Sequence, residues 1–375
     1  MTPQLGKLLP PVNTLPPKIG PRLGPHAPCR RAKGMPPCKP SLFGAPMRVL
    51  ALLLSLLLLC IGAAPAVARC AGQNLIVAMP EEESAALRAR ADAQPFARGN
   101  LWQARRGDDL VTLVGTYHLG DPRHDALLEA IAPQLVTART VLVEAGPEEE
   151  AALTARLARD PAVMVMADAS LPELLPPQEW QALAKALTDR GIPAFLGAKF
   201  QPWYITLLLA VPSCQLDAAQ LDSGLDARII EAAAAQAIPV RALERYDTLL
   251  RLFGTMTQED QLALIRNSLA MEDRAEDFAV TLSDAYFAGE SRLIWELTRA
   301  ESLRLPGATP EEVEADLAMM EETMINSRNR AWIAEIEQAA AQGPVLAAFG
   351  ALHLPGPQGV PALLEARGWT LTPLP

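Results

Sequence analysis

Two matching segments, far apart in the chain, place the strongest constraint on how this sequence folds. The first is VTLVGTYHLGDP, residues 111–122, and the second is VLAAFGALHLPGP, residues 345–357. Each is typical of a short apolar strand followed by Gly-x-x-His-Leu and a turn that contains proline. Residues that follow a strand lie at its carboxyl end, where open α/β sheets bind ligands. The two segments are therefore predicted to form two halves of one site.

Strands and helices alternate along most of the chain. Apolar runs predict strands at residues 96–105, 111–114, 140–144, 192–196, 238–244, 345–349 and 369–374. Apolar spacing of three and four residues predicts helices at 124–136, 149–159, 177–190, 202–211, 225–236 and 361–367, with a long, mostly helical stretch at 257–342. This order predicts an α/β fold. We expect a mixed, largely parallel central sheet flanked by helices, with an inserted, mostly helical section.

The amino-terminal region has the features of an export signal. Met47 and Arg48 precede a long apolar run that ends at Ala66-Val67-Ala68, which is a small-x-small cleavage pattern. Cleavage after Ala68 predicts a periplasmic or secreted protein, whereas an uncleaved segment predicts a membrane anchor. The expected organisation is a proline-rich basic extension that is disordered or untranslated (1–46), a signal peptide (47–68), a lead-in segment (69–95) and one domain (96–375).

Charge and cysteine content narrow the compartment and the partners. Residues 1–68 contain no Asp or Glu, so all 43 acidic residues lie in the remainder, which argues against nucleic acid as a partner. A membrane contact is expected only through an uncleaved signal segment. Of the five cysteines, only Cys70 and Cys214 remain after the expected cleavage. In an oxidising compartment they either form one disulfide or are two unrelated thiols.

Four predicted strands end in a residue suited to metal or acid–base chemistry: His118, Glu144, Glu244 and His353. Two neutral imidazoles and a carboxylate form a reasonable ligand set for Mn, Co or Zn, and a bound water would become a hydrolytic nucleophile. In this hypothesis His118, Glu144 and His353 hold the cation, and Glu244 is a general base or a further ligand. The rival interpretation is that both histidines only hydrogen-bond the loops after their strands.

Three other residues have a simpler interpretation beside a functional one. His124 opens a predicted helix and is expected to be a capping or surface residue. Trp203 follows Pro202 at a helix start and is expected to anchor the core rather than bind substrate. Arg328 lies on a helix with Arg330 and several glutamates, so surface ion pairs would account for it. We favour a functional role for Arg328.

At these residues the sequence resembles the TraB/GumN family, to which the Tiki metalloproteases of animals are related. The resemblance covers residues 98–375. The segments that carry it are GNLWQARRGDDLVTLVGTYHLGDPR, TVLVEAGP, KFQPWYITLLL, GLDARIIEAAAAQAIPVRALE, SRNRAWIAEI and FGALHLPGPQGVPALLEARGWTL. In place of the family's commoner Leu-Glu-Thr, this chain has Leu243-Glu244-Arg245.

The resemblance implies roles for several residues. Gly115 with His118, and Gly350 with His353, would be the paired motifs, Glu144 the shared acid, and Arg328 part of a late Arg-Asn segment. The Tiki branch implies dependence on a divalent metal, with Mn or Co favoured. The predicted function is an exported metal-dependent hydrolase that acts on a peptide or small molecule. The alternatives are a non-catalytic envelope protein that binds a small ligand, haem or metal in the same pocket, and an accessory of polysaccharide export.

Overall fold

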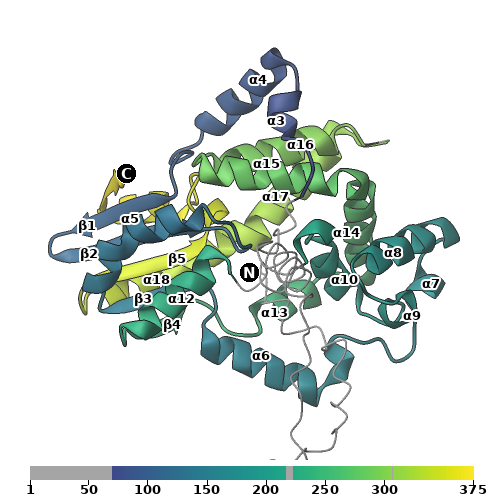
Figure 1. Ribbon diagram of the computed structural model, residues 1–375, viewed down its shortest axis with the longest axis horizontal. Coiled ribbons are helices and arrows are strands. Elements are labelled where there is room, and N and C mark those ends of the chain that lie inside the picture. Colours follow the sequence, from purple (N-terminus) through teal and green to yellow (C-terminus); the bar gives the residue numbers. More distant parts are fainter. Residues whose placement is uncertain (1–69, 217–222, 306) are drawn as a thin grey trace, which may run out of the picture. The chain divides into compact units, whose positions relative to one another are not determined.

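This computed structural model describes residues 70–216, 223–305 and 307–375, and these residues contain a six-stranded sheet, which lies on the left in Figure 1. The strand order is β4-β3-β5-β2-β1-β6. Strands β4, β3, β5 and β2 are parallel, and β1 and β6 extend the sheet in antiparallel pairing. The predicted mixed, largely parallel sheet is confirmed. Its strands are β1 (Leu101–Arg106), β2 (Asp109–Thr116), β3 (Thr140–Val143), β4 (Val240–Ala242), β5 (Val345–Gly350) and β6 (Thr370–Pro373).

The two Gly-x-x-His strands are direct neighbours in this sheet. Strand β5 pairs with β2 so that Gly115 lies opposite Phe349 and Thr116 opposite Gly350. Because parallel strands end at the same edge of a sheet, the residues after β2, β3, β4 and β5 gather there. The pairing of β5 between β2 and β3 therefore brings the first and last predicted site segments together.

Helices cover both faces of the sheet, which explains why its strands are apolar on both sides. One face packs against α18 (Ser327–Ala340) and α19 (Val360–Glu365), with Trp332 and Ile336 buried against β5. The other face packs against α5 (His124–Thr137) and α12 (Leu225–Ala235). Alternate residues of β5 serve the two cores: Val345, Ala347 and Phe349 on one face, Leu346 and Ala348 on the other.

The inserted helical section has an apolar core of its own. Helices α8 and α10 pack together with α14, which follows β4 in the chain. The strand predicted at 192–196 is wrong: residues Ala194–Gly197 form helix α9 after Pro193, which has no N–H for a strand ladder. The section comprises α6 (Pro147–Arg159), α7 (Leu171–Leu174), α8 (Pro177–Asp189), α9, α10 (Pro202–Leu209), α13 (Thr248–Gly254) and α14 (Gln258–Ala270).

The lead-in segment is folded as two helices, α3 (Leu75–Ala78) and α4 (Glu81–Asp92). They pack against α15 (Ala275–Phe287) and α16 (Ser291–Ser302), and α17 (Pro310–Glu321) lies beside α16. The buried Glu296 of α16 joins these helices because it pairs with Arg90, Arg292 and Arg299.

A disulfide also ties the lead-in segment to the helical section. Cys70 and Cys214, the pair for which a bond was one of two alternatives, are bonded in the structure, with their Cα atoms 5.2 Å apart. Within the described ranges, no helix is long and apolar enough to cross a membrane. The predicted extension and signal peptide, residues 1–68, lie outside these ranges.

Candidate functional site

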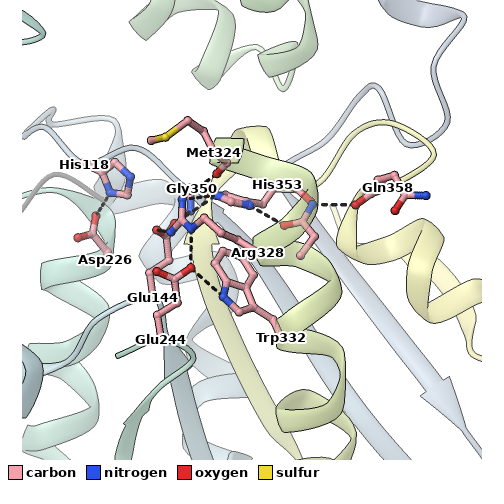
Figure 2. A network of polar contacts seen from close by, with 11 residues as sticks. His118, Glu144, Asp226, Glu244, Met324, Arg328, Trp332, Gly350, His353 and Gln358 are labelled. Atoms are coloured by element: carbon pink, nitrogen blue, oxygen red, sulfur yellow. Dashed lines mark hydrogen bonds and ion pairs between the residues drawn. The ribbon is translucent and has the colours of Figure 1, made fainter. Parts of the chain in front are cut away.

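The four side chains predicted at strand ends meet at the carboxyl edge of the sheet, and Arg328 joins them from the first turn of α18 (Figure 2). Glu144 directly follows β3, and Glu244 lies two residues after β4. His118 lies two residues after β2, and His353 ends a short 3₁₀ turn after β5. The predicted convergence of these segments is therefore present in the tertiary structure.

Arg328 lies between the two carboxylates. Its Nη2 donates to Glu144 Oε2 at 2.6 Å, and its Nε donates to Glu244 Oε1 at 2.5 Å. Its Nη1 donates to the carbonyl of Met324, which lies in the π-helical turn Glu322–Asn326 that precedes α18. The side chain is only 5% exposed, so the surface ion pairs that the sequence allowed describe Arg330, which pairs with Glu322, and not Arg328.

The ion pairs push the pKa values of the two carboxyls apart. Burial raises the pKa of Glu144, but the guanidinium of Arg328 beside it holds that pKa well below its usual value. Burial also raises the pKa of Glu244, the negative charge of Glu144 acts in the same direction, and Arg328 only partly opposes them, so the pKa of Glu244 stays above its usual value. Glu144 is therefore the carboxylate that is ionised most readily.

Each histidine is oriented by a side chain that sequence reasoning did not single out. His118 Nδ1 lies 3.0 Å from Asp226 Oδ1, and His353 Nδ1 lies 2.5 Å from Asn329 Oδ1. Since Asn329 uses its Nδ2 to donate to the carbonyls of His353 and Gln358, its Oδ1 must accept. Both rings are thus assigned a proton on Nδ1, which leaves Nε2 as the atom that can accept a hydrogen bond or bind a cation; in His353 it accepts from Arg328 Nη1 at 3.4 Å.

The protonation of His353 is further constrained by its burial. The residue is 3% exposed, and burial together with the positive charge of Arg328 holds its pKa well below the usual value. Arg328 Nη1 lies 3.4 Å from His353 Nε2, and Glu144 Oε1 lies 3.8 Å from the same nitrogen. His353 is therefore a neutral imidazole whose Nε2 faces Glu144.

Glycines let these groups approach one another. A Cβ on Gly350 would lie 3.3 Å from both Glu144 Oε1 and His118 Nε2, so glycine keeps the space between these two atoms open. A Cβ on Gly115 would lie 3.0 Å from the Cα of Ala351 and would separate β2 from the turn that carries His353. Gly224 was not predicted. A Cβ there would lie 2.8 Å from the Cα of His118, and the next residue, Leu225, donates its N–H to Tyr117 O at 3.0 Å.

Comparison with protein-family models places this site in a known family. The TraB/PrgY/gumN family model matches residues 100–373. The chain belongs to the TraB/PrgY/gumN family. The matched range contains both Gly-x-x-His segments, the two carboxylates, Arg328 and the orienting residues Asp226 and Asn329. A search of curated proteins gives no match to the chain.

A divalent cation, which the family resemblance implies, fits the donor chemistry of the site. Glu144 Oε1, His118 Nε2 and the ring of His353 border the space that Gly350 leaves open, and His353 Nε2 lies 3.8 Å from Glu144 Oε1. Asp226 and Asn329 supply the hydrogen bonds that metal-binding imidazoles usually make at their other nitrogen. Among the residues described, no group of three or more His, Cys, Asp or Glu side chains is arranged so that it could hold a metal ion.

A cavity of about 80 Å³ opens beside this polar cluster. Its wall at the sheet includes His118, Glu144 and Asp226, whereas Glu244, Arg328 and His353 are not among its lining residues. Glu244 instead lies beneath the cluster, with Oε1 accepting from Arg328 and, at 2.9 Å, from Trp332 Nε1.

One of the expectations for single residues is wrong. His124 is 0% exposed rather than a surface residue, and its ring packs against Tyr286 and Phe287 while Nε2 lies 2.9 Å from Leu119 O. Trp203 packs against the core of the helical section, as expected, and also lines the cavity. In both cases the helix start was predicted correctly. The groups that pack against each of these two side chains come from distant segments of the chain.

Proposed function

We propose that this member of the TraB/PrgY/gumN family is an exported hydrolase that depends on a divalent cation and acts on a peptide or small amide. One observation supports the proposal above the others: two imidazoles, each fixed at Nδ1 by its own acceptor, lie at the same edge of the sheet as the ionised Glu144. His353 Nε2 lies 3.8 Å from Glu144 Oε1, and His118 Nε2 lies beside Gly350, as Glu144 Oε1 does. Histidines that merely stabilised their loops would not need to converge on Glu144.

In this proposal His118 Nε2, His353 Nε2 and Glu144 Oε1 hold the cation, for which Mn, Co and Zn are the candidates. When bound, such a cation polarises a carbonyl and lowers the pKa of water, which favours hydrolysis near neutral pH. Asp226 and Asn329 keep the two Nε2 lone pairs aimed inward. The substrate binds in the cavity that His118 and Glu144 help to line.

Arg328 and Glu244 act on this centre without lining the cavity. Arg328 keeps Glu144 ionised through its ion pair with that carboxylate. The sequence suggested Glu244 as the general base or as a further ligand. Since its carboxylate is bound to Arg328 and Trp332 and does not line the cavity, we propose that it positions Arg328 instead.

Bound metal and melting temperature, measured on the same samples, test the proposal. The mature protein is incubated separately with Mn, Co and Zn, desalted, and analysed by mass spectrometry for metal. His118→Ala should abolish stoichiometric binding with little change in melting temperature, because this side chain is 28% exposed. The matched control is His124→Gln, a buried histidine outside the cluster, which should lower the melting temperature and keep the metal.

The opposite pattern would contradict the proposal. If the wild-type protein takes up none of the three metals, or if His118→Ala keeps its metal, the histidines are structural. Stoichiometric metal without turnover would support the alternative, a non-catalytic envelope protein that holds a small ligand in the cavity. The apolar wall of that cavity is the observation that favours this second candidate.

A further inference from the structure

The cavity next to His118 and Glu144 has a polar wall and an apolar wall. The polar wall lies at the ends of β2 and β3, and the apolar wall belongs to the helical section and α12. Side chains from three helices of that section form most of the apolar wall: Leu153 and Leu157 of α6, Trp203, Tyr204 and Leu207 of α10, and Leu249 and Leu250 of α13.

Helix α10 divides its apolar side chains between a core and this cavity. Ile205 and Leu208 are at most 3% exposed within the core of the helical section. Trp203 and Leu207 are only half-buried and line the cavity. The core of the section is therefore complete without Leu207, and its apolar surface is available to a bound group.

The indole of Trp203 is held in place, so the apolar wall is formed in advance. Its Nε1 donates to Val163 O at 3.1 Å, and its backbone N–H donates to Gln261 Oε1 at 3.2 Å. Its ring lies 5.8 Å from that of Phe253, at an interplanar angle of 31°. A group that enters the cavity thus meets a rigid surface, which lowers the entropic cost of binding.

The charges around the cavity favour a neutral occupant over an anionic one. Glu149 and Glu150 join Glu144 and Asp226 in its lining, and none of the described lining residues is a Lys or Arg. An acidic side chain would be repelled by these carboxyl groups and would meet no Lys or Arg side chain in the described lining.

Size narrows the occupant further. An apolar cavity of about 150 Å³ admits a benzene ring. A space of about 80 Å³ is smaller than that and suits a four-carbon aliphatic group. The chemistry that matches both walls is an aliphatic amino-acid side chain whose neighbouring amide carbonyl lies at His118 and Glu144.

We propose that this cavity is a specificity pocket for the leucine-sized side chain of a peptide, and that Leu207 of α10 sets its depth. The inference rests on the proposed hydrolase function for the placement of the scissile bond. The pocket itself is defined by the lining residues and can be tested without turnover.

The first experiment uses the mature, metal-loaded protein and a mixture of synthetic peptides. In this mixture each residue type occurs on either side of the peptide bonds that can be cleaved. Mass spectrometry of the products should show Leu, Ile or Met at one fixed position from the cleaved bond. Preference over Ala should be at least about tenfold, as expected for several methylene groups in an apolar pocket, and Asp and Glu should be absent there.

Variants of Leu207 should change this preference in opposite directions. Leu207→Trp fills the pocket and should shift the preferred residue to Ala or Gly, whereas Leu207→Ala enlarges it and should admit Phe. The matched control is Leu196→Trp, the same change at an exposed residue of α9, which should leave the profile unchanged. Cleavage with no preferred residue, or a profile that neither Leu207 variant alters, would overturn the pocket while leaving hydrolysis intact.

A second measurement separates failure of the pocket from failure of the hydrolase. If no peptide is cleaved, saturation-transfer NMR is run with N-acetyl-leucinamide and with the amide of N-acetyl-aspartate. The leucine methyl groups should receive saturation from the wild type and from Leu196→Trp, and should lose it in Leu207→Trp. The aspartate compound should receive none. Equal signals from both compounds, or a leucine signal that survives in Leu207→Trp, would refute the pocket.

Discussion

Replacing Arg328 with methionine should destabilise the protein by about 3–5 kcal/mol at pH 7. Arg328, Glu144 and Glu244 have side chains that are 5%, 7% and 4% exposed, so water cannot replace the lost guanidinium. Methionine preserves much of the apolar stem but removes the guanidinium, whose Cζ lies 5.1 Å from the ring centre of Trp332. The loss therefore measures the cost of two buried carboxylates that no longer have a cation between them.

The destabilisation should depend on pH in a defined direction. In the wild type the lowered pKa of Glu144 stabilises the fold above the carboxyl's unfolded pKa of about 4.3, and this stability is lost as pH falls through the lower folded value. In Arg328→Met, burial without the cation raises the folded pKa above the unfolded one. The variant then loses stability as pH rises, so its deficit should be largest at pH 7 and smaller at pH 5.

Urea denaturation followed by tryptophan fluorescence, at pH 7 and pH 5, gives both quantities. Adding Glu144→Gln to Arg328→Met removes one buried charge and should recover part of the loss. The matched control is Arg330→Met, an exposed arginine on the same helix whose pair with Glu322 should contribute little to stability. If Arg328→Met costs no more than Arg330→Met, or if its deficit is the same at both pH values, the reasoning about buried charge is wrong.

Three further predictions concern the compartment, the disulfide and the orientation of His118. Amino-terminal sequencing of the exported protein should begin at Arg69, and a protein that retains residues 47–68 in the membrane would contradict cleavage. Cys214→Ser should lower the unfolding free energy by about 2–4 kcal/mol, because the bond spans 144 positions of sequence. An unchanged denaturation midpoint would contradict this. Asp226→Asn should weaken metal binding about 10–100-fold with little change in melting temperature. Metal titration checks it, and unchanged affinity would remove Asp226 from the proposed centre.

Several site residues could be predicted because short patterns in the sequence next to them indicate where a strand ends. Apolar runs that stop at Gly115, Glu144 or Gly350 indicate buried strands, and parallel strands must end at one edge of a sheet. This reasoning placed His118, Glu144, Glu244 and His353 together before any tertiary contact was known. The family resemblance added Arg328. Gly350 was marked by its motif alone, and only the tertiary structure shows that a Cβ there would press on Glu144 Oε1 and His118 Nε2, each 3.3 Å away.

The sequence by itself determined which elements form, since hydrophobic periodicity and turn residues act over a few positions. Only the tertiary structure decided what each site residue touches. Asp226 lies on α12 and Asn329 on α18, and both reach the histidines because these helices cover opposite faces of one sheet. The burial of Arg328 and His124, and the place of Trp203 beside the cavity, likewise depend on distant segments. The cost of burying a charge or a ring is set by everything packed around it, and a local pattern does not contain that information.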